Sequence, residues 1–194
     1  MLKADSEIIV DDEIILRRFT HEIDSKKYEI ILANHDHLLP WLPWADMYHK
    51  FEDMLNFTED QIRAFDAGKQ FGYDVYYRGE LAGSIDIHDI AEDDHHCDLG
   101  YWLDQNFTGK GIMTRSVAKL TDYCFNKLNM HRVVIKAAPE NNTSVAVAER
   151  LNFTKEARHR EDQLLGNRYY DTIVYIKINE ASWVFAFQRH LSYN

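Results

Sequence analysis

The spacing of hydrophobic and polar residues changes several times along the chain, and each change predicts a new element of secondary structure. Short apolar or alternating runs predict strands, and longer stretches with apolar residues three or four positions apart predict helices. The predicted strands cover residues 13–19, 71–77, 80–87, 98–103, 131–137, 154–160 and 169–178. The predicted helices cover residues 25–34, 58–68, 112–128, 141–151 and 180–190. This order of elements indicates a mixed sheet with helices packed on it.

The middle of the chain predicts a strand–helix–strand unit. The helix expected from Ile112 to Leu128 carries an apolar stripe that must lie on a sheet. The run Val133–Ile135 is apolar on both faces, as a buried parallel strand requires. A helix that connects two parallel strands makes a βαβ unit, which we expect to be right-handed. Earlier in the chain, Arg78-Gly79 predicts the turn of an antiparallel hairpin.

Local signals indicate where some of these elements begin and end. Residues 38–44 hold two prolines and two tryptophans, so they predict a bent loop rather than a helix interior. Thr58, followed by Gln61, predicts a helix N-terminus. Asn141 or Asn142 predicts another, and Asn152 stands where a helix C-terminus needs left-handed backbone.

Composition narrows the class of protein. A chain of 194 residues with 45% hydrophobic content predicts one domain over residues 1–194, with residues 180–194 as a helical extension. The net charge of −10 repels nucleic acid and suits a cationic acceptor such as an amine. No apolar run approaches the roughly 20 residues that span a bilayer, and the acidic N-terminus lacks the features of a secretory signal. With Cys97 and Cys124 as its only cysteines, the chain is expected to be cytoplasmic and reduced.

The segment from Gln105 to Met113 follows a predicted strand and opens a predicted helix. Its sequence, QNFTGKGIM, lets glycine N–H groups and the first turn of the helix point into one concavity, which predicts an anion site. A P-loop would need a hydroxyl residue directly after its lysine, but Gly111 stands there. A dinucleotide-binding fingerprint would need a third glycine where Thr114 stands. Both of these phosphate-binding motifs are therefore excluded.

The ordered set DLGYWL, FTGKGIMT, HRVVIKA, PENNTS and ERLNF resembles the GNAT acetyltransferases, and within them the RimJ/RimL-type ribosomal-protein N-acetyltransferases. ILRRF, WLPW and RYYDTIVYIKI extend the resemblance over nearly the whole chain. Two positions depart from the family: Asn106, where its loop often has Gln or Arg, and Asn152, where it usually has Gly. The resemblance implies an α+β GNAT fold, with a mixed, mostly antiparallel twisted sheet, a central βαβ unit and helices on both faces. It also implies acetyl-CoA as cosubstrate and no metal.

Carried over to this chain, the resemblance implies a binding role for three segments. The strand end at Trp102 and Leu103 would bind the pantetheine arm of acetyl-CoA. Asn141 and Ser144 would flank that arm near the thioester, although both also suit a purely structural role at a helix N-terminus. Gly100 would mark a bulge that separates two parallel strands. The pyrophosphate would lie on the main chain of Thr108, Gly109, Lys110, Gly111, Ile112 and Met113.

Amide formation needs a neutral amine, a polarised thioester carbonyl and a proton for the departing thiolate. We expect direct attack without a covalent enzyme intermediate. Ser144 is predicted to give the proton to sulfur, and Glu161 is predicted to act as the base. Gln163 stands where related enzymes place a carboxylate. Three further residues compete with Glu161 for the role of base: Asp86, His88 and Asp98.

Trp41 and Trp44 are predicted to cover the acceptor amine, with ordinary core packing as the equal alternative. The cluster from His88 to Cys97 lacks the ligand spacing of known metal motifs and is expected to be a charged surface loop. The aromatic segment Trp183–Phe187 is expected to pack on the protein's own sheet, with a homodimer contact as the alternative.

The predicted reaction is the transfer of an acetyl group from acetyl-CoA to a primary amine. The expected acceptor is the N-terminal amine of a protein, and the family branch suggests a ribosomal protein. A small amine such as a polyamine or an aminoglycoside is the alternative within the enzymes. A non-catalytic module that binds acyl-CoA is the alternative outside them.

Overall fold

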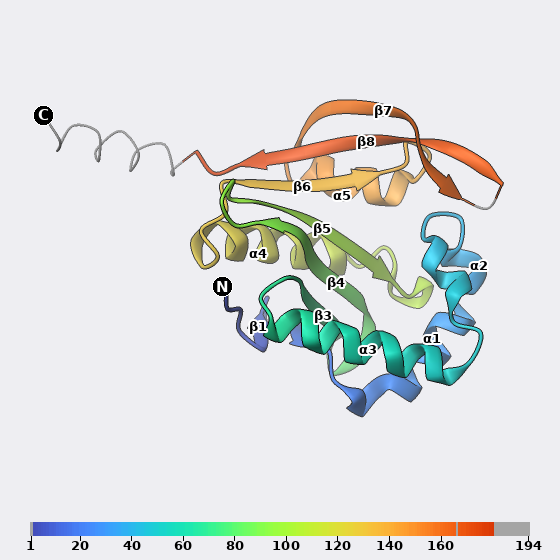
Figure 1. The fold of residues 1–194 in the computed structure, drawn as a ribbon. Coiled ribbons are helices and arrows are strands. Elements are labelled where there is room, and N and C mark those ends of the chain that lie inside the picture. The colour runs from blue at the N-terminus through green and yellow to red at the C-terminus, as the bar shows by residue number, and fades with distance from the viewer. Residues whose placement is uncertain (1, 166, 181–194) are drawn as a thin grey trace, which may run out of the picture.

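In the computed structural model, residues 2–165 and 167–180 are described, and they form one eight-stranded sheet (Figure 1). The strand order is β1-β2-β3-β4-β5-β6-β8-β7. Only β5 and β6 are parallel among the pairs of described strands. The strands are β1 Glu7–Ile9, β2 Ile14–Arg18, β3 Phe71–Tyr77, β4 Glu80–Ala91, β5 His96–Leu103, β6 Arg132–Ala137, β7 Thr154–Leu165 and β8 Arg168–Ile178.

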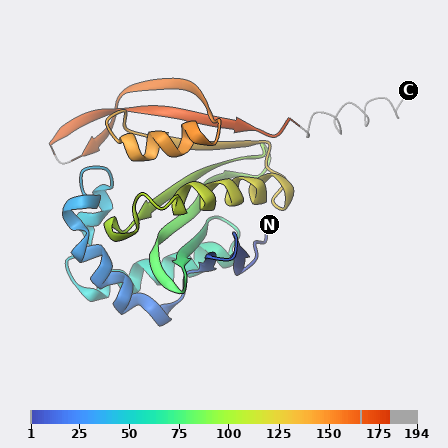
Figure 2. The ribbon, with the colours of Figure 1, turned by 180° about the vertical axis from the view of Figure 1, so that it is seen from behind.

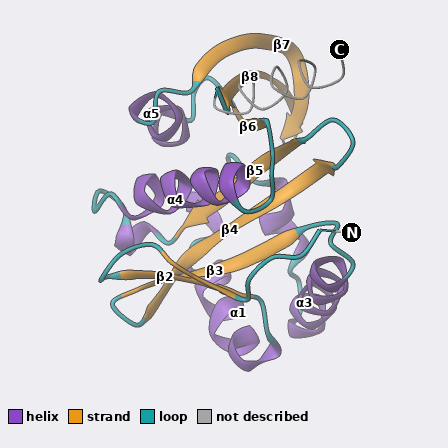
Figure 3. Ribbon diagram, turned by 90° about the vertical axis from the view of Figure 1, so that its left-hand side faces the viewer, coloured by secondary structure: helices purple, strands orange, loops and turns teal. Residues whose placement is uncertain are grey.

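Helices cover both faces of this sheet. Helices α1, α2 and α3 lie on one face, whereas α4 and α5 lie side by side on the other (Figures 2 and 3). Three short 3-10 helices, η1 His21–Ile23, η2 Pro43–Met47 and η3 Gln105–Phe107, lie in the connections. The α-helices are α1 Asp24–Ala33, α2 His35–Leu38, α3 Phe51–Asp66, α4 Ile112–Asn126 and α5 Asn142–Arg150. The expected mixed, mostly antiparallel sheet with helices on both faces is confirmed.

The parallel strands β5 and β6 stay paired over three residues only. His96, Cys97 and Asp98 pair with Arg132–Val134, and beyond Asp98 the two strands part. From there β5 pairs with β4 alone and β6 with β8 alone. The sheet therefore opens on the C-terminal side of Asp98, between the remaining residues of β5, up to Leu103, and those of β6.

The predicted bulge at Gly100 is wrong. Gly100 pairs in regular register with Asp86, and the irregularity between β4 and β5 lies further along, between His88 and Ala91. The reason for a glycine is a close approach of side chains instead. A Cβ on Gly100 would lie 2.5 Å from Oδ1 of Asp86.

Two apolar clusters hold the helices to the sheet. The larger one joins α4 and α5 to the strands, and it contains the predicted α4 stripe, with Val117, Leu120 and Cys124 fully buried. The smaller one joins α1, η2 and α3 to Leu81 and Trp102. Each large aliphatic side chain buried in this way contributes about 1.5–3 kcal/mol.

Several element boundaries differ from the sequence predictions. Helix α3 begins at Phe51, not at Thr58, and Thr58 is buried within the helix, where its hydroxyl donates a hydrogen bond to Asp24. Strand β1 was not predicted.

Other local predictions are confirmed. Asn152 has a positive φ of 55°, and Asn141 caps α5. The predicted C-terminal helix, with its aromatic segment, lies almost entirely outside the described residues, so its packing stays a prediction. Within the described part of the chain, no helix combines the length and the apolarity needed to cross a bilayer.

Candidate active site

A cavity of about 900 Å³ lies where β5 leaves β6. The C-terminal half of β5, the loop before α4, the first turns of α4 and α5, and the α2 region form its walls. The lining includes ten of the residues that the sequence places at the site: Trp41, Trp102, Leu103, Thr108, Gly109, Gly111, Ile112, Met113, Asn141 and Ser144. One space therefore brings together segments that lie about a hundred residues apart.

The loop before α4 has the geometry of an anion cradle. Gly109 and Gly111 adopt positive φ values of 76° and 70°, which glycine tolerates without strain. Gly111 is the N-cap of α4, and no side chain caps that end. Among the described residues, none accepts a hydrogen bond from the N–H groups of residues 109–114. These free donors and the positive end of the helix dipole together suit a pyrophosphate.

Buried polar side chains hold this loop in place. Asp104 is 6% exposed and accepts hydrogen bonds from both the N–H and the side chain of Asn106. Asn34, at the end of α1, accepts a hydrogen bond from the N–H of Gln105 over 2.9 Å. Because both anchors act before the first glycine, the main chain of the cradle is positioned without using its own N–H groups.

Ser144 lies in the first turn of α5 and faces β5. Asn141 accepts hydrogen bonds from the N–H of Ser144 over 3.1 Å and from Oγ1 of Thr143 over 2.8 Å. The hydroxyl oxygens of Ser144 and Tyr101 lie 3.0 Å apart. Burial raises the pKa of Tyr101 to about 12, although the bond with Ser144 opposes that rise, so the phenol stays neutral. Tyr101 was missed from sequence because its contact with Ser144 spans 43 positions.

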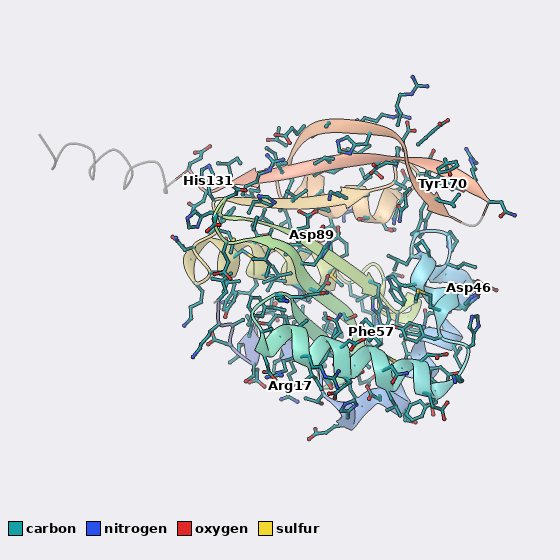
Figure 4. The ribbon with its side chains drawn as sticks, viewed as in Figure 1. Arg17, Asp46, Phe57, Asp89, His131 and Tyr170 are labelled. Atoms are coloured by element: carbon teal, nitrogen blue, oxygen red, sulfur yellow. The ribbon has the colours of Figure 1, made fainter. Side chains whose placement is uncertain are left out.

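A second cavity, of about 840 Å³, lies on the opposite face of the sheet, beneath α1 and α3. Its lining combines aromatic residues with acidic ones, and Asp89 and Phe57, labelled in Figure 4, belong to β4 and α3 respectively. The acidic residues of this lining are Asp53, Asp60, Asp86 and Asp89. Both cavities are lined by Leu42, Gly100, Tyr101 and Trp102. The two spaces therefore adjoin at the part of β5 that has left β6.

Asp86 and His88 project from β4 at this junction. Asp86 accepts hydrogen bonds from the N–H of Gly100 over 3.1 Å and from Gln70 over 2.7 Å. Nδ1 of His88 lies 3.4 Å from Oδ1 of Asp86. Burial alone would lower the pKa of His88, but the carboxylates of Asp86, Asp98 and Asp89 raise it above the usual 6.5.

The remaining predicted site residues lie elsewhere. Trp44 lines the second cavity and makes an edge contact with Trp102, with 6.2 Å between ring centroids. Lys110 is exposed and donates a hydrogen bond to the carbonyl of Asn106. Glu161 is exposed, with a positive φ of 51°, at an irregular part of β7. Neither Lys110 nor Glu161 lines either of the two cavities described here.

The His/Asp cluster is not the surface loop that the sequence suggested. His88 and Asp98 belong to strands β4 and β5, and only residues 92–95 form the turn between them. A ring nitrogen of His88 and carboxylate oxygens of Asp89 and Asp98 lie within 4.8 Å of one another. Asp98 is 5% exposed, and its Oδ2 lies 2.7 Å from Nζ of Lys136. The ammonium of Lys136 thus already neutralises the most buried carboxylate of the cluster.

Comparisons with known proteins agree with this geometry. Residues 13–154 match the acetyltransferase (GNAT) domain family. The chain is 30% identical to the putative ribosomal N-acetyltransferase YdaF of Bacillus subtilis, covering 90% of this chain and 95% of that protein. It is 26% identical to the ribosomal-protein-serine acetyltransferase of Escherichia coli, covering 79% and 86%.

Two solved structures share the fold. The first is RimL, a ribosomal alpha-N-protein acetyltransferase, in complex with coenzyme A, with a TM-score of 0.87, 27% identity and coverage of 90% of this chain and 99% of that one. The second is the microcin C7 self-immunity acetyltransferase MccE in complex with acetyl-CoA and AMP, with a TM-score of 0.86, 28% identity and coverage of 91% and 98%.

The chain belongs to the GNAT family of acetyltransferases. It is an acetyl-CoA-dependent N-acetyltransferase, and its first cavity fits that cosubstrate. The fit rests on the unbonded N–H groups at the start of α4, which would hold the pyrophosphate, and on the free edge of β5, which would hold the pantetheine arm.

Proposed function

We propose that this protein acetylates the N-terminal α-amine of a protein in the cytoplasm, and that the acceptor is a ribosomal protein. The observation that carries the proposal is the junction of the two cavities at Gly100–Trp102. Acetyl-CoA would occupy the first cavity and the acceptor amine would enter from the second. Several relatives are named as ribosomal-protein acetyltransferases, and this supports the choice of acceptor.

The charge of the second cavity suits a cationic acceptor. Four aspartates line it, and the ammonium of Lys27, the one Lys or Arg in that lining, is paired with Asp74 over 2.7 Å. An α-amine has a pKa of about 7.7–8.0, so an appreciable fraction is already neutral near pH 7. A lysine side chain, with a pKa of about 10.4, would demand a much stronger base. The chemistry therefore favours an N-terminal amine over a lysine side chain.

Ser144 is proposed to protonate the departing thiolate. Its hydroxyl lies in the first cavity, and the neutral phenol of Tyr101 sits 3.0 Å away to hold it in position. Deprotonation of the amine needs a separate group on the acceptor side. The sequence leaves four residues for that role: Glu161, Asp86, His88 and Asp98.

The test is thiol release from acetyl-CoA in the presence of different amines. Peptides that begin with Ala or Ser and copy the N-termini of ribosomal proteins should release coenzyme A and gain one acetyl group by mass spectrometry. The same peptides with a blocked N-terminus but an intact lysine are the matched control and should be inert.

Release with a polyamine or an aminoglycoside, and none with the peptides, would replace the proposed acceptor by a small amine. Tight binding of acetyl-CoA in calorimetry without release to any amine would instead indicate a binding module.

A further inference from the structure

We propose that His88, which lies beside Asp86, is the base that takes the proton from the acceptor amine. This inference rests on the proposed function, since it needs an amine that enters through the second cavity. It differs from the sequence prediction, which placed Glu161 first and His88 among its competitors.

The position of His88 is the first argument. Gly100 belongs to the segment of β5 that both cavities share, and a Cβ built on Gly100 would lie 3.2 Å from Cε1 of His88. The side chain of His88 therefore borders the place where an amine in one cavity meets a thioester in the other. A general base must stand within hydrogen-bond reach of the proton that it removes.

The other candidates are less suited to this place. Glu161 is exposed and lines neither cavity. Gln163 lines the first cavity, but an amide is no base at neutral pH. Oδ2 of Asp98 forms an ion pair with Nζ of Lys136 over 2.7 Å, and Asp86 accepts hydrogen bonds from Gly100 and Gln70. Both carboxylates therefore already have partners.

The carboxylate of Asp86 lies beside His88. Its Oδ1 lies 3.4 Å from Nδ1 of the imidazole, and Gly100 and Gln70 fix the carboxylate from two sides. At this separation the carboxylate acts on the imidazole through its charge and not through a hydrogen bond. Nδ1 of His88 is buried and forms no hydrogen bond with any of the described residues, so this nitrogen is free to accept a proton. The carboxylate of Asp89, which lines the second cavity near His88, would attract the ammonium form of the acceptor beforehand.

The proton transfers balance as follows. The acceptor ammonium gives one proton to His88, and the neutral nitrogen forms the C–N bond with the thioester carbonyl carbon. When the C–S bond breaks, the second proton of that nitrogen reaches the sulfur through the hydroxyl of Ser144. The products are the acetylated amine and free coenzyme A, and His88 returns its proton to water.

The same geometry sets the pH dependence. Only neutral His88 can accept a proton, so kcat/KM should rise with pH through the pKa of His88, above 6.5 because of the nearby carboxylates. Three carboxylates act on His88, those of Asp86 and Asp89 of β4 and of Asp98 of β5. Asp53 and Asp60 of α3 and Lys27 of α1 line the same cavity, and Lys136 of β6 is paired with Asp98. Acidic residues outnumber basic ones, which agrees with a raised pKa.

The experiment compares His88→Gln with the wild-type protein on an N-terminal peptide. We expect kcat to fall by about a hundredfold and the rise of kcat/KM near neutral pH to disappear. The affinity for acetyl-CoA in calorimetry and the melting temperature should stay close to the wild-type values. His49→Gln is the matched control, because His49 is an exposed histidine that lines neither cavity.

A second variant separates catalysis from structure. His88→Ala should regain part of its activity when imidazole is added, because free imidazole can enter the vacated space and accept the proton. Wild-type kinetics for His88→Gln would overturn the proposal, and so would loss of the same pH limb in Glu161→Gln but not in His88→Gln. If the wild-type protein itself acetylates no amine, the proposed function fails instead, and this result is distinct from either outcome for His88.

Discussion

At the scale of single residues, Ser144 has the most specific of the proposed chemical roles. Ser144→Ala should lower kcat by at least about tenfold, since a positioned acid typically contributes more than that. The KM for acetyl-CoA should change little, because the cradle at residues 109–114 is intact. Steady-state thiol release over a range of acetyl-CoA concentrations measures both quantities.

Thr143→Ala is the matched control for this variant. Thr143 is the exposed neighbour of Ser144, and its hydroxyl also bonds to Asn141. Both variants therefore lose a hydroxyl in the first turn of α5. They differ because only the hydroxyl of Ser144 contacts Tyr101. Turnover of Ser144→Ala at the wild-type rate would remove Ser144 from the chemistry and leave it a helix-terminal residue.

At Gly100, neighbouring side chains leave no room for a Cβ atom, and the backbone conformation itself does not require glycine. In Gly100→Ala, the new methyl would lie 2.5 Å from Oδ1 of Asp86 and 3.2 Å from Cε1 of His88, so both side chains must move. We expect kcat to fall by about tenfold or more, because displacements of about 1 Å are costly in a positioned site. Kinetics and coenzyme A calorimetry test this together. A normal kcat with weakened binding would show that Gly100 serves the cofactor side alone.

At the scale of elements, the N-terminus of α5 brings together the helix cap, Asn141, and the proposed proton donor, Ser144. Asn141→Ala removes the acceptor for the N–H of Ser144 and for Oγ1 of Thr143, so it should lower the free energy of unfolding by about 1 kcal/mol. Turnover should fall as well, because Ser144 loses part of its support. Asn142→Ala is the control, since Asn142 is exposed and is not the cap. Urea denaturation that ranks the two variants equally would contradict the assignment.

The elements that the sequence predicts best are those with a strong local pattern. The apolar stripe of α4 has the spacing of a helix, and the continuous apolar run of β6 is typical of a buried strand. Both elements are found where the sequence predicts them. The predicted start of helix α3 lies too far along the chain, because the actual N-cap is Lys50, a residue type that does not signal a helix start. Asp53 instead accepts hydrogen bonds from the N–H groups of His49 and Lys50. Thr58 is not an N-cap, because its hydroxyl donates a hydrogen bond to Asp24 of α1.

The candidate site also has parts that follow from local sequence and parts that depend on contacts between distant residues. The cradle is local, so the glycines at 109 and 111 were sufficient to predict it. The partners of Ser144 and His88 depend on how strands pair, and sequence spacing says nothing about Tyr101 lying beside Ser144 or Asp86 beside Gly100. The sequence therefore leaves four candidate bases, and the proposal of His88 depends on the two cavities that meet at one segment of β5.

At the scale of the whole molecule, a buried ion pair ties helix α1 to the sheet. Lys27 of α1 and Asp74 of β3 are each 1% exposed, and their charged atoms lie 2.7 Å apart. The ammonium of Lys27 also lies 3.7 Å from the ring centre of Phe19. Removing one partner of such a pair leaves an uncompensated charge in the interior, which is strongly destabilising. The wall of the second cavity thus depends on a charge balance that pH can change.

Burial raises the pKa of Asp74 to about 6, although Lys27 opposes that rise. Between about pH 4 and pH 6 the folded state therefore holds a proton that the unfolded state releases. The stability contributed by this proton is fully present below the unfolded pKa of 3.8 and is lost as pH rises through about 6. The advantage in unfolding free energy of the wild-type protein over Asp74→Asn should grow from about pH 7 to pH 4, by on the order of 3 kcal/mol. Urea unfolding at both pH values measures it, with the surface variant Asp12→Asn as control. A difference between wild type and Asp74→Asn that does not change with pH would mean that Asp74 stays ionised beside Lys27 throughout this range.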